Sequence, residues 1–277
     1  MTLPRILFVT GTGTGVGKTV AAAAVTALAC ARGESVAVVK PAQTGVPPGE
    51  PGDLADIGRM SGCRASWHEL ARYPDPLSPE AAARVAGMAP LDLAAAAGRI
   101  TELAAGHDLV LVEGAGGLLV RYHPDGWTLA DLAALLTAPL LVVTAAGLGT
   151  LNHTALTLAA MTARRLRLAG LMIGAWPPEP DLAERSNVAD LESLAGEPLA
   201  GGLPAGAGAC QGDAFRRIAA AGLAPVLGGS FDPAGFRERF PPPGHTAAGP
   251  PGHAAAAAGA QPGSGRPYES DSQEERR

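Results

Sequence analysis

The sequence is poor in aromatic residues and in cysteine. Phe, Trp and Tyr make up only 4% of the 277 residues, although 47% of the residues are hydrophobic. A buried core therefore has to be built mainly from Ala, Val and Leu. The three cysteines, Cys30, Cys63 and Cys210, have no paired spacing and no CxxC motif. This pattern favours reduced thiols in a cytosolic protein over a disulfide framework.

Basic charge and long apolar runs are also scarce. The net charge is −5 and the pI is near 5.7, so the sequence predicts no nucleic-acid partner. The one basic cluster, at positions 164, 165 and 167, is typical of a solvated helix end. No apolar stretch is long enough to span a membrane, and the first apolar run is too short for a secretory leader. We therefore expect a soluble, cytoplasmic protein without a membrane partner.

Lysine is nearly absent. The chain has 19 arginines but only two lysines, Lys18 and Lys40, as if arginine had replaced lysine wherever it could serve. An ammonium group is a compact point charge, whereas a guanidinium group is a broad planar fork. A tight phosphate or carbamate site can require the ammonium group, so we interpret both lysines as functional. Asparagine is equally scarce and occurs only at Asn152 and Asn187.

The main motif present is the stretch GTGTGVGKT at residues 11–19, between the apolar run 6–9 and a long alanine-rich segment. A strand, a glycine loop and a helix start in this order place backbone N–H groups and a helix dipole on phosphate oxygens. Lys18 can then reach the β- and γ-phosphates, and the Thr19 hydroxyl can coordinate Mg²⁺. The loop is one residue longer than the usual Walker A pattern, because Thr12 stands where the first glycine is expected. The motif predicts a bound nucleoside triphosphate.

A second apolar strand, predicted over 35–40, ends at Lys40 and is stopped by Pro41. Lys40 thus lies at the carboxyl end of a strand, where open α/β sheets bind their ligands. Thr44 supplies a hydroxyl close by. Asp53 is predicted to be the N-cap of a helix over 54–60, and a metal-binding role for it needs support from outside this pattern.

The stretch LVLVEGAGG at 109–117 predicts a buried strand that ends in a carboxylate, Glu113, and a second glycine turn. Such a carboxylate can hold Mg²⁺ or its water, as in a Walker B strand. The alternative is a carboxylate that only caps a turn. A further strand over 140–144 leads into a helix that runs to about 165, whose first N–H groups can attract a carboxylate. His153 on this helix is better explained as a surface residue than as a general base, because it has no positioned partner.

Further strands are predicted over 168–174 and 198–203, and further helices over 80–86, 91–105 and 213–221. Strands that alternate with helices predict an α/β protein of the P-loop NTPase type, with a mostly parallel sheet and helices on both faces. We assign residues 1–240 to this domain. The Pro-, Gly- and Ala-rich stretch 241–277 cannot bury a core and is predicted to be a disordered tail.

Taken together, the motifs at 11–19, 40–45, 113–117 and 148–152 resemble those of the dethiobiotin synthetase family over roughly residues 3–230. The longer glycine loop is this family's own form. The resemblance implies an ATP- and Mg²⁺-dependent cyclo-ligase of biotin biosynthesis. Its substrates are 7,8-diaminopelargonate and CO₂ or bicarbonate, and it forms a homodimer with the site at the interface. Two alternatives are a partitioning ATPase and an amidotransferase-type synthetase. The former would lack Lys40-Pro41 with Thr44, and the latter would carry a further domain with a nucleophilic cysteine.

The resemblance also implies roles for individual residues. Lys40, Lys18 and Thr14 would be catalytic, and Thr19, Asp53 and Glu113 would hold Mg²⁺, with Asp56 as a rival to Asp53. The substrate would contact Thr44 and the helix start Gly149, Thr150, Leu151 and Asn152. The nucleotide would contact Gly13, Thr14, Gly15, Val16, Gly17, Lys18, Thr19, Val20, Asp53, Glu113, Gly114, Ala115, Gly116, Gly174, Ala175, Leu203, Pro204 and Ala205.

One departure from the family concerns the base pocket at 174–175 and 203–205. Many members place an asparagine after the strand that ends at Gly174, whereas this sequence continues Ala175-Trp176. A pocket without a side-chain amide discriminates weakly between bases. We therefore expect a relaxed choice of nucleotide, including CTP.

Overall fold

The computed structural model describes residues 3–241, so the predicted tail from 242 to the end lies outside the described residues. A seven-stranded sheet, in the order β4-β2-β6-β1-β7-β8-β9, forms the centre of the fold, and all six of its strand pairings are parallel. This confirms the predicted fold class. Its strands are β1 (Ile6–Gly11), β2 (Val36–Lys40), β4 (Ser66–Glu69), β6 (Leu109–Gly117), β7 (Leu140–Thr144), β8 (Leu168–Trp176) and β9 (Gly201–Pro204). Two short strands, β3 (Gln43–Thr44) and β5 (Arg72–Tyr73), pair separately.

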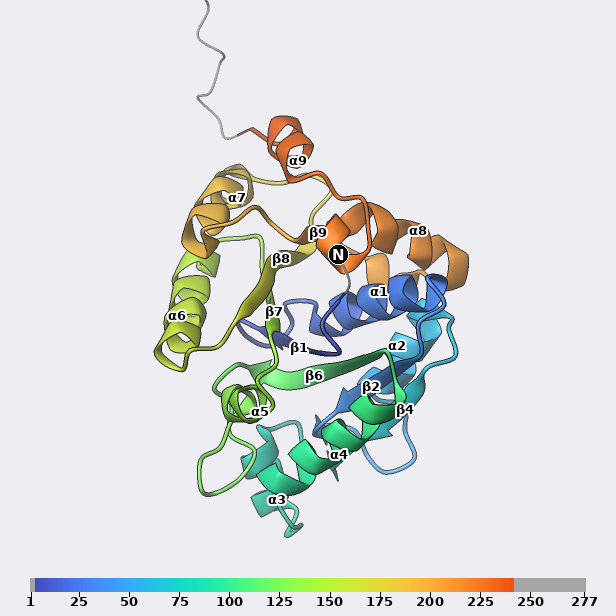
Figure 1. The fold of residues 1–277 in the computed structure, drawn as a ribbon. Helices are drawn as coiled ribbons and strands as arrows, with labels where there is room; N and C mark the ends of the chain where they lie inside the picture. The colour runs from blue at the N-terminus through green and yellow to red at the C-terminus, as the bar shows by residue number, and fades with distance from the viewer. Residues whose placement is uncertain (1–2, 242–277) are drawn as a thin grey trace, which may run out of the picture. The chain divides into compact units, whose positions relative to one another are not determined.

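Helices cover both faces of the sheet (Figure 1). One face carries α1 (Lys18–Ala31), α2 (Asp53–Ser61) and α8 (Gly212–Gly222). The other carries α3 (Pro79–Val85), α4 (Leu93–Gly106), α5 (Leu129–Leu135), α6 (Thr150–Ala163) and α7 (Leu182–Ala195). A final helix, α9 (Pro233–Arg239), follows α8. The strands separate two apolar cores, because successive side chains point to opposite faces.

The core on the α1 face has the composition that the scarcity of aromatic residues predicts. Four consecutive alanines of α1, at 21–24, are fully buried beside Val25. Small side chains let this helix lie close to β1, so the helix start is held rigidly beneath the glycine loop. Phe215 of α8 is the one large aromatic residue in this core.

Several local predictions differ from the structure. Gly52, not Asp53, is the N-cap of α2; Asp53 is the first helical residue, and its N–H donates to Gln43 Oε1 over 2.8 Å. The predicted strand over 198–203 begins later, at Gly201. The helices α5, α7 and α9 and the short strands β3, β4 and β5 were not predicted. The short strands carry too few residues to show a period, and they form only because they pair with other segments.

Two of the three cysteines are neighbours in space. Cys30, near the end of α1, lies beside Cys63, just after α2, although 33 positions separate them in the sequence. A hydrogen bond with the Cys30 thiol lowers the pKa of Cys63 to about 7. All three cysteines are free thiols, as expected.

Candidate active site

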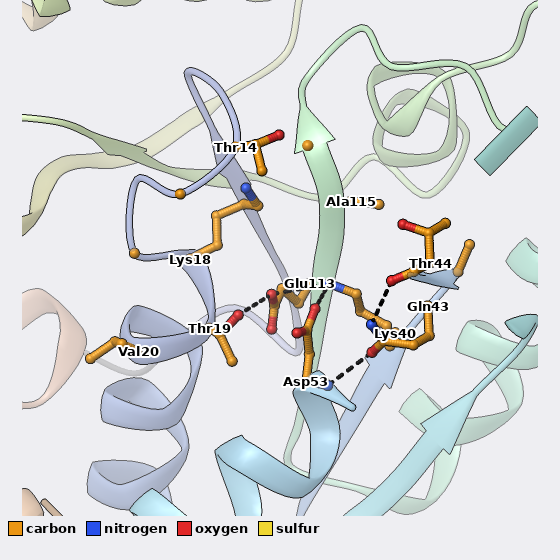
Figure 2. A pocket seen from close by; sticks show the side chains of 14 residues that line it. Thr14, Lys18, Thr19, Val20, Lys40, Gln43, Thr44, Asp53, Glu113 and Ala115 are labelled. Carbon is orange, nitrogen blue, oxygen red and sulfur yellow. Dashed lines mark hydrogen bonds and ion pairs between the residues drawn. The ribbon is translucent and has the colours of Figure 1, made fainter. Parts of the chain in front are cut away.

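Three neighbouring strands bring the predicted site together. In the sheet order, β6 lies between β2 and β1, and all three are parallel. Their carboxyl ends therefore meet at one edge of the sheet. Lys40 is the last residue of β2 and the glycine loop follows β1, whereas Glu113 lies within β6, which continues through the predicted glycine turn to Gly117. Figure 2 shows these segments converging on one cavity.

The cavity has a volume of about 410 Å³. It receives the phosphate loop from one side, Lys40 and Glu113 from below, and the β3 segment from the other side (Figure 2). The lining residues are Thr14, Gly15, Gly17, Lys18, Thr19, Val20, Lys40, Ala42, Gln43, Thr44, Asp53, Glu113, Ala115 and Gly116.

Lys40 is the electrostatic centre of this cavity. Its side chain is only 4% exposed, and its Nζ lies 3.1 Å from Glu113 Oε1 and 3.3 Å from the Gly114 carbonyl oxygen. A second carboxylate, that of Asp53, forms an ion pair with the same ammonium group. Burial alone would lower the pKa of Lys40, but the charges of Glu113 and Asp53 outweigh it and raise the pKa. The lysine is therefore held fully charged at neutral pH.

Lys18 faces the same space from the phosphate loop. Its Nζ donates to the Gly13 carbonyl oxygen over 2.8 Å. Burial, and then repulsion by Lys40, lower the pKa of Lys18. An anion between the two ammonium groups would relieve that repulsion. The phosphates of a nucleoside triphosphate would supply such an anion.

The oxygen atoms at the floor of the cavity fit Mg²⁺. Thr19 Oγ1 donates to Glu113 Oε1 over 2.8 Å. Glu113 Oε2 is buried and has no hydrogen-bond partner within residues 3–241, so the site holds an acceptor that a cation would satisfy. Two carboxylates and a hydroxyl suit Mg²⁺, which takes few protein ligands and keeps phosphate oxygens and waters. Asp53 lines the cavity, whereas Asp56 points outward and pairs with Arg59 over 3.0 Å.

Comparison with known proteins decides the family. A family model described as an AAA domain matches residues 5–208. The chain is 60% identical over 235 residues to the ATP-dependent dethiobiotin synthetase BioD of Parafrankia sp. (strain EAN1pec), covering 85% of this chain and 98% of that one. It is 55% identical over 237 residues to the enzyme of the same name from Streptomyces coelicolor, covering 86% and 99%. The chain belongs to the ATP-dependent dethiobiotin synthetase family.

A solved structure, a ParA family ATPase from Chlorobium tepidum TLS, aligns with a TM-score of 0.47 and 15% identity over 81% of this chain and 95% of that one. The fold assignment itself follows from the parallel sheet and the glycine loop described above. No helix in the described part of this synthetase family member is long and apolar enough to cross a membrane.

The residues predicted for the base pocket of this family member gather at the ends of β8 and β9. The Ala205 N–H donates to the Trp176 carbonyl oxygen over 2.7 Å, which ties the two strand ends together. Gly174 is buried against the phosphate loop, and a Cβ there would lie 2.0 Å from the Val16 carbonyl oxygen. Leu203 is fully buried in the core, whereas the next two residues, Pro204 and Ala205, are exposed. Ala175 is exposed, and none of these residues lines the phosphate cavity.

The predicted substrate turn lies elsewhere on the molecule. Gly149, with φ of 89°, precedes α6, and Asn152 on the first turn of the helix is exposed. None of the four residues 149–152 lines the cavity that holds Lys40. Within one chain, the structure does not bring this turn together with the catalytic lysines, although Thr44 does line the cavity.

Sequence reasoning missed two residues that position the site. Gln43 accepts from the Asp53 N–H and so fixes the start of α2 beside Lys40. Tyr122 is fully buried, and its hydroxyl accepts from the Ala115 N–H over 2.8 Å, which holds the glycine turn after Glu113. Gln43 stands next to Thr44 in the recognised motif, so a signal was available. Tyr122 had none, because it stands apart from the motifs.

Proposed function

We propose that this chain is a dethiobiotin synthetase that carboxylates 7,8-diaminopelargonate with CO₂ and closes the ureido ring, converting ATP to ADP and phosphate. The observation that carries the proposal is the Lys40 ammonium group held between Asp53 and Glu113 opposite a phosphate loop. The named relatives share 55–60% identity with this chain over nearly their whole length.

The reaction has three steps. One substrate amine attacks CO₂ and loses a proton, which gives a carbamate. A carbamate oxygen attacks the γ-phosphorus, and the bond to ADP breaks. The second amine then attacks the carbonyl carbon of the phosphorylated carbamate and loses a proton, and phosphate leaves with the bonding electron pair. The enzyme contributes positioning and charge neutralisation rather than covalent chemistry.

The charged groups of the cavity fit these steps. Lys18 serves the β- and γ-phosphates, and Lys40 stabilises the carbamate and the transferring phosphoryl group. Thr14 and Thr44 line opposite sides of the cavity, where Thr14 would contact the phosphates and Thr44 the substrate. Thr19, Asp53 and Glu113 would hold Mg²⁺, which neutralises negative charge on the phosphoryl oxygens when bound.

The second part of the proposal is a homodimer whose substrate carboxylate is received by the turn before α6 of the neighbouring protomer. Residues 149–152 lie outside the Lys40 cavity of their own chain, which supports this arrangement. Nearby apolar side chains are unusually exposed: Leu148 at 93%, Leu156 at 62% and Leu119 at 47%. The last two line a further cavity of about 430 Å³ between the phosphate loop and α6. Exposed apolar side chains of this kind mark an interface.

The proposed enzyme is cytoplasmic, which the three free thiols suit.

The base of the nucleotide is held by the backbone at the ends of β8 and β9, without a side-chain amide at Ala175. We therefore expect comparable kcat/KM for ATP, CTP and other triphosphates. Strict dependence on ATP would contradict this expectation.

The deciding experiment uses the purified full-length protein with diaminopelargonate, bicarbonate, Mg²⁺ and each nucleoside triphosphate in turn. Dethiobiotin and phosphate are expected in equal amounts, and both require diaminopelargonate. Phosphate release that does not respond to diaminopelargonate would refute the proposal and favour a P-loop ATPase of another kind.

A further inference from the structure

Four threonine hydroxyls form a cluster between the phosphate loop and the turn before α6. Thr144, the last residue of β7, is at its centre. Its Oγ1 lies 2.6 Å from that of Thr150, 2.8 Å from that of Thr154 and 3.3 Å from that of Thr12. Thr144 and Thr154 are fully buried, and Thr150 is 3% exposed. Polar groups buried to this extent have to satisfy one another.

The chemistry of the hydroxyl group fixes the direction of these hydrogen bonds. A hydroxyl has one proton to donate and two lone pairs that accept. Thr150 Oγ1 lies 2.7 Å from the Ala145 carbonyl oxygen, which can only accept, so the proton of Thr150 is directed there. Thr144 must then donate to Thr150 and accept from the other two hydroxyls. Thr144 thereby uses its full hydrogen-bonding capacity.

The result is a directed chain from Thr12, through Thr144 and Thr150, to the backbone of the β7–α6 turn at Ala145. Thr12 belongs to the phosphate loop, and its N–H also donates to the Val143 carbonyl oxygen over 3.0 Å. Hydrogen bonds in such a chain polarise one another and strengthen the whole. The loop and the turn therefore have one fixed relative position.

The same turn is also held by a residue of α7 that does not line the Lys40 cavity. Asn187 on α7 is 6% exposed, and its Nδ2 donates to the Ala146 carbonyl oxygen over 2.8 Å and to that of Gly147 over 3.1 Å. It is one of only two asparagines in the chain. The two hydrogen bonds of Asn187 reach the turn, whereas those of Thr144 reach both the turn and the loop.

We propose that Thr144 is a positioning residue that sets the β7–α6 turn relative to the phosphate loop. This inference rests on the proposed function, in which the N–H groups of residues 149–152 receive the substrate carboxylate. Thr144 does not line the Lys40 cavity and acts through Thr12 and Thr150. In the proposed homodimer, the hydroxyl chain ties the phosphate loop of one protomer to the turn that serves the site of its partner.

The test replaces Thr144 by valine, which keeps the shape of the side chain but removes the hydroxyl. Thr144→Val removes three hydrogen bonds, of which only the one with Thr12 joins the turn to the loop. We expect Kd and KM for diaminopelargonate to rise about tenfold from the loss of that one link, and the loss of the other two to appear as lower stability. The kcat at saturating substrate should change less than about twofold, because the carbamate, Lys40 and the γ-phosphate keep their places. Thr144→Ser restores the hydroxyl and should restore the wild-type KM.

A matched control is available in Thr10, the β1 residue that precedes the loop by one position. It is equally buried, and its hydroxyl has no hydrogen-bond partner in the described part of the chain. Thr10→Val should leave KM and Kd unchanged. If Thr144→Val does not fold, Thr12→Val tests the same link, because Thr12 is the partly exposed first member of the hydroxyl chain. This variant should also raise KM.

The outcomes separate the inference from the proposed function. Wild-type protein without diaminopelargonate-dependent phosphate release would refute the function. An active wild-type protein whose KM and Kd are unaffected by Thr144→Val would refute the positioning role and leave the function standing. An equal loss of kcat in Thr144→Val and Thr144→Ser would also overturn it, because the hydroxyl would then be irrelevant.

Discussion

Lys40→Arg tests whether the site needs a compact ammonium group rather than a positive charge alone. The Lys40 side chain is almost completely enclosed, with two carboxylates and the Gly114 carbonyl oxygen around Nζ. Guanidinium is larger and planar, so it fits only if Asp53 and the start of α2 move. Overpacking of this kind costs about 1–3 kcal/mol in stability. We expect a loss of about 10²- to 10³-fold in kcat, as when a preorganised stabilising group is displaced.

Lys40→Met tests how much the positive charge of Lys40 contributes to the stability of the protein. It keeps the length of the side chain but leaves Glu113, whose side chain is 1% exposed, without its ion-pair partner. Removing one member of a buried pair costs about 3–5 kcal/mol. In a domain of this size each 1 kcal/mol lowers Tm by about 2–4 °C, so a fall of roughly 6–20 °C is expected. Mg²⁺ with nucleotide should recover part of it, because the metal replaces the missing positive charge between the carboxylates.

The assays are steady-state phosphate release with diaminopelargonate, and thermal unfolding with and without Mg²⁺-nucleotide. The raised pKa of Lys40 fixes the pH dependence of the stability difference between wild type and Lys40→Met. A lysine whose folded pKa is raised stabilises the fold fully below the unfolded value of about 10.4, and this contribution is lost as the pH rises through the folded pKa. The difference should therefore be flat from about pH 7 to 9. Full activity of Lys40→Arg would refute the steric argument, and an unchanged Tm of Lys40→Met would refute the electrostatic one.

Three further predictions follow from the same structure. Asp53→Asn should raise the Mg²⁺ concentration needed for half-maximal activity about tenfold, as for the loss of one metal ligand or its orienting partner, whereas Asp56→Asn, which alters an outward-facing residue, should not. Leu156→Asp should shift the protein from dimer to monomer in light scattering and abolish turnover, whereas Val85→Asp, similarly exposed at 58% but on α3 and outside the α6 cavity, should remain dimeric. Because its pKa is lowered to about 7, Cys63 should be alkylated by iodoacetamide at neutral pH faster than the other two cysteines.

Local patterns were sufficient to predict that several of the candidate residues lie together. The glycine loop, Lys40 and Glu113 each follow a buried apolar run, and parallel strands place such residues at one edge of a sheet. This expectation did not require the order of the strands in the sheet. The strand order explains, however, why Lys40 and Glu113 form an ion pair, because β2 and β6 are neighbouring strands with Val39 opposite Val112.

The features that were missed depend on contacts between distant segments. The β4 strand exists because it pairs with β2, and its sequence of four residues carries no period of its own. Tyr122 reaches the glycine turn at Ala115 only after the intervening residues fold back. Asp53 was predicted to cap its helix by its own side chain. Instead, that side chain is directed to Lys40 and Gly52 takes the N-cap position, because an ion pair with a buried ammonium group outweighs a cap at a solvated helix end.

The extra residue in the phosphate loop now has a structural explanation. In the shorter Walker A pattern, a glycine occupies the position of Thr12 and carries no hydroxyl. Here Thr12 binds the end of β7 through both its N–H and its side chain, next to the Gly11–Val143 pairing of β1 and β7. A loop anchored in this way cannot shift independently of the strand that leads into α6. The lengthened loop thus binds phosphate on one side and, on the other, contacts the strand that sets the position of the proposed substrate turn.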